Sequence, residues 1–151
     1  MTAYLDALKM LARRELSEAQ IRLRLARREH DPDAIDAAVG RLREERAIDD
    51  ARVAGAMART QTSIKRRGKL RVRQQIEQAG ILPATARQAV DQVFSALDED
   101  ALLDAALGKR LRAGEKIADD AAFRRLFRYL VGQGFEPDRV MALLKKRSPR
   151  R

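Results

Sequence analysis

The chain has 151 residues, with 32 lysines and arginines against 22 aspartates and glutamates, which gives a formal net charge of +10. It contains no cysteine, so disulfides, thiolate metal sites and cysteine nucleophiles are excluded. No apolar run approaches the ~20 residues that cross a bilayer, and the N-terminal residues lack a signal-peptide pattern, so we expect a cytoplasmic protein. The cationic surplus favours a negatively charged partner, whether nucleic acid, anionic lipid or an acidic protein surface.

Helix-forming residues, notably alanine, leucine and arginine, dominate the composition and predict an all-α fold. The first expected helix carries Leu5 and Leu8 on one face. Ser17 follows as a favourable N-cap for a second helix, whose apolar face includes Ile21 and Leu25. These elements begin a pattern that returns twice further along the chain.

Three of the four prolines, Pro32, Pro83 and Pro137, recur at separations of 51 and 54 residues. Apolar residues with helical spacing precede and follow each of them. Proline suits the first position of a helix, because its missing N–H needs no intrahelical acceptor there. The sequence therefore predicts the same unit three times: a helix, a sharp turn and a second helix.

The turn between the paired helices carries a glycine in two of the three copies, at Gly80 and Gly134. Glycine readily takes the left-handed conformation that ends a helix, and the next residue then folds back onto that helix. Glu29 stands at this place in the first copy, where the same conformation costs about 1 to 2 kcal/mol. We therefore expect a less regular turn at Glu29 and His30, with the His30 ring packed on Leu25 and without a catalytic role.

A leading helix precedes each of these units, and Asp31 is expected to cap the proline-led helix of the first. Asp49 and the acidic stretch 98–100 are expected to begin the second and third leading helices. Three tandem three-helix modules result, at residues 1–47, 48–97 and 98–151. Units of about 50 residues bury little surface alone, so we expect the modules to pack in an elongated, curved array, as a monomer.

Side chains suited to catalysis are scarce, since the chain has one histidine and no cysteine, and we do not expect an enzyme. The pair Gly68 and Lys69 lacks the earlier glycine and the following hydroxyl of a phosphate-binding loop. The acidic pairs at 49–50 and 119–120 are interpreted as helix caps. No metal-ligand spacing or cofactor motif is present.

The most informative charge feature is the stretch 51–76, which holds eight lysines and arginines and no acidic residue. Ordinary helix faces mix both signs, and a solvated face of that kind is the alternative interpretation. We interpret six of these cations as a docking edge for phosphates or carboxylates. They are Lys65, Arg66, Arg67, Lys69, Arg71 and Arg73.

A second basic group lies nearer the N-terminus and is interrupted by glutamates, so it is the weaker candidate. Its members are Arg13, Arg14, Arg22, Arg24, Arg27 and Arg28. The basic tail at 145–151 is a further, nonspecific anion contact. Aromatic residues are few and mostly in apolar phase, so we do not expect stacking on single-stranded bases.

Several segments, in their order and spacing, resemble the RecX family, the bacterial regulatory proteins of the RecA recombinase. They are residues 7–17, 48–54 and 68–73, the turn at Gly80-Ile81, and Leu130 with Gly134-Phe135. The resemblance implies three tandem three-helix repeats. It also implies binding to the RecA filament on DNA, with suppression of its ATP hydrolysis, strand exchange and coprotease activity in DNA repair and the SOS response.

Carried onto this chain, the resemblance places the RecA and DNA contact on the six cations of the docking edge, with Arg13 and Arg14 as a secondary group. The chain departs from the family at Glu29-His30, where a basic residue and glycine are common, and at Val53, where phenylalanine is usual. One alternative function stays open, a module that binds single- or double-stranded DNA directly and without base readout. Tight binding to RecA without DNA would exclude that alternative.

Overall fold

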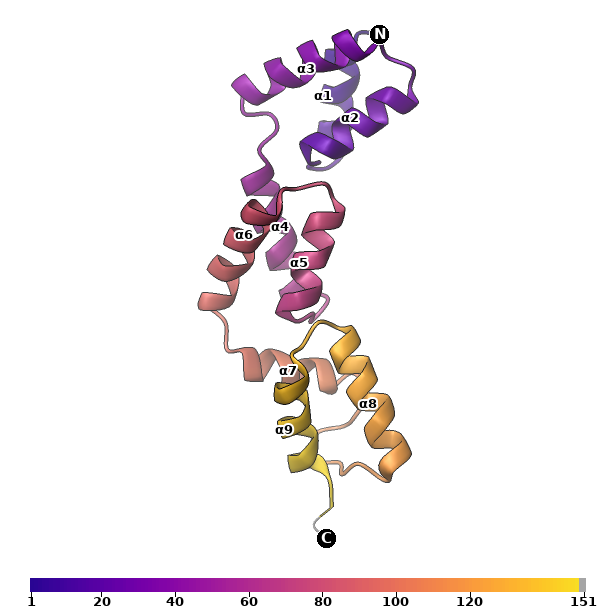
Figure 1. Cartoon of the computed structure of the whole chain (residues 1–151), viewed down its shortest axis with the longest axis vertical. Coiled ribbons are helices and arrows are strands. Elements are labelled where there is room, and N and C mark those ends of the chain that lie inside the picture. The colour runs from indigo at the N-terminus through magenta and orange to yellow at the C-terminus, as the bar shows by residue number, and fades with distance from the viewer. Residues whose placement is uncertain (150–151) are drawn as a thin grey trace.

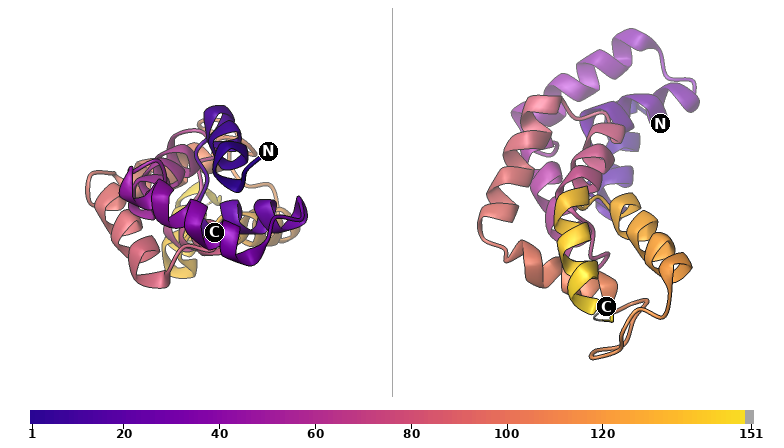
Figure 2. Two further views of the ribbon diagram at one scale, coloured as in Figure 1. Left: turned by 90° about the horizontal axis from the view of Figure 1, so that it is seen from above. Right: turned by 60° about the horizontal axis from the view of Figure 1, so that its bottom comes forward.

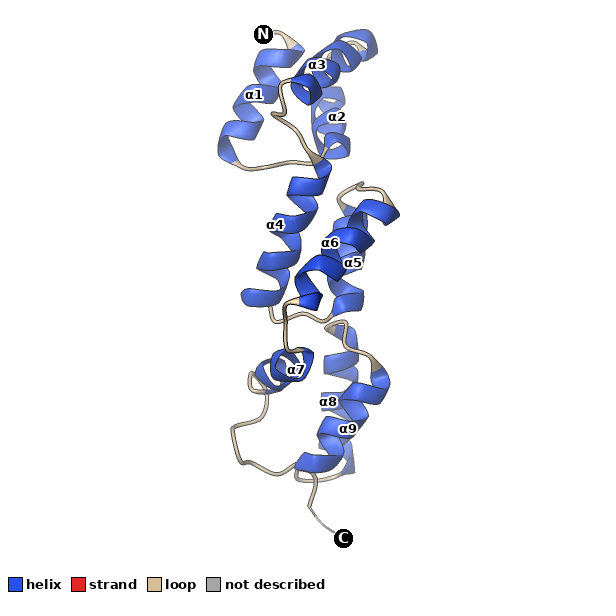
Figure 3. Cartoon of the chain, turned by 90° about the vertical axis from the view of Figure 1, so that its left-hand side faces the viewer, coloured by secondary structure: helices blue, strands red, loops and turns tan. Residues whose placement is uncertain are grey.

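The computed structural model describes residues 1–149, and every regular element in this range is a helix, as Figure 3 shows. Arg150 and Arg151 of the predicted basic tail lie outside the described residues. The helices are α1 (Ala3–Arg13), α2 (Glu18–Arg27), α3 (Pro32–Glu44), α4 (Asp50–Ser63), α5 (Lys69–Gln78), α6 (Pro83–Ser95), α7 (Glu99–Leu107), α8 (Asp120–Gly132) and α9 (Pro137–Arg147). The predicted all-α class is therefore confirmed.

The helices pack in three consecutive groups, which we call the first bundle (α1–α3), the second bundle (α4–α6) and the third bundle (α7–α9). The bundles follow one another along an elongated, bent molecule, with the N-terminus at one end and the C-terminus at the other (Figure 1). Seen end-on in Figure 2, the bundles overlap, so the row runs along the long axis. The array of three-helix units that the sequence predicts is confirmed.

Two kinds of helix start account for eight of the nine described helices, and α5 begins after Gly68 without a side-chain cap. In five helices the N-cap side chain accepts a hydrogen bond from a backbone N–H of the first turn. These N-cap residues are Thr2, Ser17, Asp49, Asp98 and Asp119. The third helix of each bundle begins instead with proline, which sets the backbone angle itself. Asp31 holds the N-cap position of α3 but makes no side-chain cap bond, so its predicted capping role is wrong.

The turn after the second helix contains one left-handed residue in every bundle. Its left-handed residue has φ of +64° at Glu29, +81° at Gly80 and +102° at Gly134. The next N–H folds back onto the helix, from His30 to the Leu25 carbonyl at 3.2 Å and from Phe135 to the Leu130 carbonyl at 3.3 Å. The expectation of an irregular first turn is therefore wrong, because Glu29 adopts the strained conformation that glycine takes elsewhere.

The buried apolar residues form two clusters rather than three. One lies within the first bundle and runs from Ala3 to Ile48. The other runs from Val53 to Leu144 and joins the second and third bundles in a single core. The boundaries at residues 47 and 97 stay a prediction, and the second of them falls within a continuous apolar cluster.

A buried carboxylate in the first bundle has no counterpart in the sequence-based expectations. Asp6 is 3% exposed and accepts a hydrogen bond from the Arg28 guanidinium. His30 Nε2 lies 2.8 Å from the other carboxylate oxygen of Asp6. The recorded polar contact of the His30 ring is therefore with Asp6, where the sequence suggested only packing on Leu25.

Candidate anion-binding surface

The predicted docking edge is built around the start of α5, which lies against the end of α8. The N–H of Gly68 donates to the Gln133 carbonyl at 2.8 Å, and the N–H of Leu70 donates to the Gly134 carbonyl at 3.1 Å. A Cβ on Gly68 would lie 2.6 Å from the backbone of Gly134, so only glycine allows this approach. The α8 carbonyls therefore satisfy N–H groups that a phosphate-binding loop would direct at its ligand.

The other end of α5 meets α2 in the same head-to-tail manner. Ser17 donates from its hydroxyl to the Ala79 carbonyl at the end of α5, while the same oxygen accepts the N–H of Gln20 in α2. A Cβ on Gly80 would lie 2.3 Å from the Cβ of Ala19, so this junction is also close-packed. The two contacts place α5 between α8 and α2.

Helices α8, α5 and α2 thus form one interrupted rod, which Figure 1 shows down the right-hand side of the molecule. Their dipoles follow one another head to tail, because the end of each helix meets the start of the next, although α2 is turned away from the direction of α5 in Figure 1. The three helices carry nine lysines and arginines against three acidic residues. We call this feature the basic rod, and its cations are Arg22, Arg24, Arg27, Lys69, Arg71, Arg73, Arg124, Arg125 and Arg128.

The six predicted site residues divide into three pairs. Lys65 and Arg66 are exposed on the loop between α4 and α5. Lys69 lies 3.3 Å from Asp91, and Arg73 lies 3.2 Å from Glu77. The docking edge is therefore partly neutralised by the chain's own carboxylates, which the absence of acids within residues 51–76 concealed. Exposed pairs of this kind contribute only about 0 to 1 kcal/mol, so an anionic partner displaces the carboxylates at little cost.

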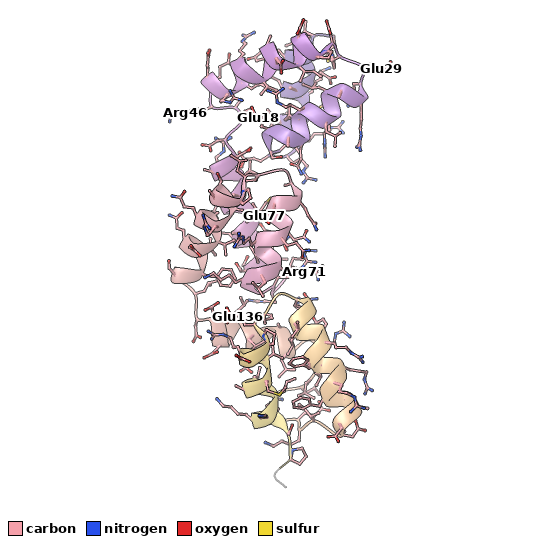
Figure 4. The ribbon with its side chains drawn as sticks, in the orientation of Figure 1. Glu18, Glu29, Arg46, Arg71, Glu77 and Glu136 are labelled. Atoms are coloured by element: carbon pink, nitrogen blue, oxygen red, sulfur yellow. The ribbon has the colours of Figure 1, made fainter. Side chains whose placement is uncertain are left out.

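Arg67 and Arg71 form the third pair, and each makes a hydrogen bond within the protein: Arg67 bonds α4, and Arg71 bonds the end of α8 across the junction. Arg67 is half-buried and donates to the Gln61 side chain at 2.7 Å, and Arg71 donates to the Gly132 carbonyl at 3.0 Å. Burial, followed by repulsion from Arg71, lowers the pKa of the Arg67 guanidinium, which nevertheless stays charged in a protein. Figure 4 shows Arg71 at the end of α5 nearest α8.

The secondary basic group is also divided by the structure. Arg22 pairs with Asp36 at 2.6 Å and reaches Glu18 at 3.9 Å. Arg13, Arg14 and Arg27 are exposed. The group therefore presents its unpaired charge at the end of α1 and on α2, whereas Arg22 and Arg28 are paired with carboxylates.

Cations in the third bundle were missed by the sequence analysis. Arg124, Arg125 and Arg128 are exposed on α8. The repeat register could have found them, because Arg125 lies twelve residues before Pro137, as Arg71 lies twelve residues before Pro83. These cations lie outside the acid-free stretch 51–76 that was used to predict the site. The packing of α8 against α5 brings Arg125 and Arg71, which are 54 residues apart, into the same surface feature.

Two further findings concern metal-binding groups and membrane spans among residues 1–149. No group of three or more histidine, cysteine, aspartate or glutamate side chains in this range is placed to hold a metal ion. No helix in the described part of the chain is long and apolar enough to span a membrane. The acidic pairs act at helix ends instead: Asp49 and Asp119 cap their own helices, and Asp50 accepts the N–H of Glu18 at the start of α2.

Comparison with known proteins identifies the family. The model of the RecX first three-helix domain matches residues 3–42, and that of the RecX second three-helix domain matches residues 49–90. The regulatory protein RecX of Halorhodospira halophila is 31% identical over 137 residues, covering 90% of this chain and 82% of the relative. The chain belongs to the RecX family.

Other members of the RecX family agree with this assignment. The regulatory protein RecX of Chromohalobacter salexigens is 32% identical over 135 residues, covering 89% of this chain and 86% of the relative. A crystal structure of a regulatory protein RecX matches the fold with a TM-score of 0.80 at 22% identity, covering 95% of this chain and 70% of the other. RecX from Lactobacillus salivarius gives 0.74 at 18% identity, covering 95% and 93%. The first two of these are named regulatory protein RecX, and the fold shared with the two solved structures extends over the third bundle as well.

Proposed function

We propose that this RecX-family chain binds the RecA–DNA nucleoprotein filament as a monomer in the cytoplasm and inhibits the recombinase. The inhibited activities are ATP hydrolysis, strand exchange and coprotease activity, so the chain modulates recombination and DNA repair. Family membership supports RecA as the partner. The basic rod supports an anionic, extended partner, because its cations are spread over all three bundles instead of lining one compact cavity.

The observation that carries the proposal is the placement of cations along an elongated array. A filament repeats its anionic surface along its axis, and a row of bundles meets several repeats at once. Each single contact at an exposed surface is weak, but linked contacts act together through their effective concentration. The long body therefore gives a physical means for binding along a filament groove and bridging neighbouring subunits.

Within this surface, we assign the direct contacts to the exposed Lys65 and Arg66 and to Lys69 and Arg73 once their carboxylate partners are displaced. Arg71 holds the junction between α5 and α8, Arg67 bonds to α4, and both contribute charge from these positions. The exposed Arg128 on α8 extends this contact surface into the third bundle. Phosphates and acidic side chains both satisfy such cations, and arginine binds either through paired N–H donors.

A second candidate function is direct, sequence-independent DNA binding, which the nine cations of the basic rod also favour. In that case the affinity for bare DNA falls steeply with salt: the logarithm of the binding constant decreases against the logarithm of the salt concentration with a slope of about 0.7 to 0.9 for each phosphate neutralised. A tight complex with RecA that lacks DNA separates the two functions, because a pure DNA-binding module would not form it.

The experiment that tests the proposed function is the steady-state ATPase of RecA on single-stranded DNA, with increasing amounts of the full chain. We expect ATP hydrolysis to fall at or below a stoichiometric amount of the chain. A parallel titration on bare DNA shows whether any loss arises because the chain competes for DNA. An unchanged ATPase at saturating chain would refute inhibition of RecA.

A further inference from the structure

A pocket of about 380 Å³ opens beside the end of α1, separate from the junction between α5 and α8. Its lining comes from α1, from α2 and from the residues that end these helices. The lining residues are Lys9, Met10, Arg13, Arg14, Arg24 and Arg28. Five of the six are cationic and none is acidic, so the pocket concentrates positive charge in one concave place.

Four of the five cations in this pocket have no carboxylate partner within the described chain. Lys9, Arg13, Arg14 and Arg24 form no salt bridge with another residue of the described chain. This contrasts with Lys69 and Arg73 of the docking edge, which have carboxylate partners. Four like charges that converge without a counter-ion repel one another, and a bound anion relieves that repulsion.

Arg28 differs from the other four because a buried carboxylate positions it. Its guanidinium donates to Asp6, which is 3% exposed and also contacts His30. Asp6 contributes one acceptor group, whereas a guanidinium has five N–H donors. Arg28 is therefore anchored at the wall of the pocket with donors remaining for a ligand.

The lining also indicates which anion fits. Met10 is its one apolar residue and is itself buried, and no aromatic side chain lines the pocket, so it offers no surface for stacking a base. Protein interfaces have an apolar centre, which this pocket lacks. Interfaces with nucleic acid are more polar and more positively charged, and arginine matches phosphate oxygens through paired donors.

We propose that this pocket of the first bundle binds consecutive phosphates of a nucleic-acid backbone, independently of base identity. The proposal rests on the proposed function in one respect, the identification of the nucleic acid as the DNA of the RecA filament. Affinity for the phosphates is a property of this chain alone and requires no recombinase. The pocket thereby contacts DNA, while the cations of the basic rod in the second and third bundles face the filament.

The test uses fluorescence anisotropy of a dye-labelled phosphodiester oligomer that lacks bases, titrated with the full chain. Arg14→Glu reverses one exposed charge in the pocket, and Arg87→Glu reverses an exposed charge on α6, outside both the lining and the basic rod. We expect Arg14→Glu to weaken binding about tenfold. We expect Arg87→Glu to weaken it less than about threefold, because Arg87 lies in the second bundle, outside the lining, and salt screens charges that do not contact the ligand.

Competition identifies the source of the anion. Tripolyphosphate should displace the oligomer well below the concentration at which a glutamate peptide of equal charge does. Equal losses in the two variants, or equal competition by the peptide, would overturn the proposal, the latter in favour of an acidic protein surface. Binding of tripolyphosphate without binding of the oligomer would overturn the backbone assignment. Arg14→Gln, which introduces no negative charge, should show a smaller loss in the same direction.

Each of these outcomes is separate from the ATPase assay on RecA. Loss of oligomer binding in Arg14→Glu with full inhibition of RecA leaves the proposed function intact. Circular dichroism of each variant establishes that the helices are retained, which is expected because both arginines are exposed.

Discussion

The backbone N–H of Gly68 donates to the carbonyl of Gln133 at 2.8 Å, so α5 begins where α8 ends. This bond crosses from the second bundle to the third, and it lies beside an apolar core that the two bundles share. The junction with the first bundle lies outside that core, because the first bundle has an apolar cluster of its own, and it includes the hydroxyl of Ser17 on the Ala79 carbonyl. We therefore expect the second and third bundles to behave as one stiff unit.

Substitution of Gly68 by alanine tests this junction. The added Cβ would lie 2.6 Å from the backbone of Gly134 and Phe135, which cannot move aside as a flexible side chain does. We expect Gly68→Ala to lower the free energy of unfolding by about 1 to 3 kcal/mol, as for other overpacked sites. Urea denaturation followed by circular dichroism measures the change.

Gly40→Ala is the matched control for that substitution. Gly40 lies within α3, and a Cβ there would meet no atom within 4 Å. Alanine in a helix is more stable than glycine by roughly 0.5 to 1 kcal/mol, so this variant should be stabilised. Equal effects of the two substitutions would show that contact across the junction is not the cause.

Glu29 allows a test of the strained turn in the first bundle. Glu29 has a φ of +64° and occupies the turn position that glycine occupies in the other two bundles. We expect Glu29→Gly to raise the free energy of unfolding by about 1 kcal/mol, because glycine adopts this conformation without the Cβ penalty. Glu29→Ala keeps the Cβ and should give no such gain. A thermal melt that places the glycine variant below the alanine variant would contradict the assigned geometry.

The buried carboxylate of Asp6 should matter more than exposed ones. Asp6→Ala removes the acceptor for Arg28 and His30, and we expect a loss of about 1 to 3 kcal/mol in unfolding free energy. Asp36→Ala, which breaks the exposed pair with Arg22, should cost at most about 1 kcal/mol. Urea midpoints of the two variants give the comparison, and a greater loss for Asp36→Ala would count against the role of burial.

The sequence predicted the repeat well because prolines and helix caps act locally. Pro32 begins α3 as proposed, and Gly80 and Gly134 have the positive φ that their positions suggested. The regular turn at Glu29 was not predicted, because a local cost of about 1 to 2 kcal/mol is outweighed by packing that a sequence does not display. Local helix and turn propensities predicted the helices and turns of each three-helix unit but not the packing between units.

The candidate surface was predicted less completely, because long-range packing decides it. Asp91 and Glu77 lie outside the acid-free stretch and still pair with Lys69 and Arg73. The stacking of α8 on α5 brings Arg128 into one rod with residues far away in sequence. Such pairings depend on the relative placement of helices, and no short motif encodes that placement.

The measurement that most directly tests the central claim compares inhibition of the RecA ATPase on single-stranded DNA by the wild type and three variants. Arg66→Glu and Arg128→Glu reverse exposed charges on the docking edge and on α8, whereas Arg87→Glu reverses an exposed charge on α6, outside the basic rod. We predict half-maximal inhibition at about tenfold higher concentration for the first two and little change for Arg87→Glu. Wild-type inhibition by Arg66→Glu and Arg128→Glu would contradict the claim that these cations carry the interaction.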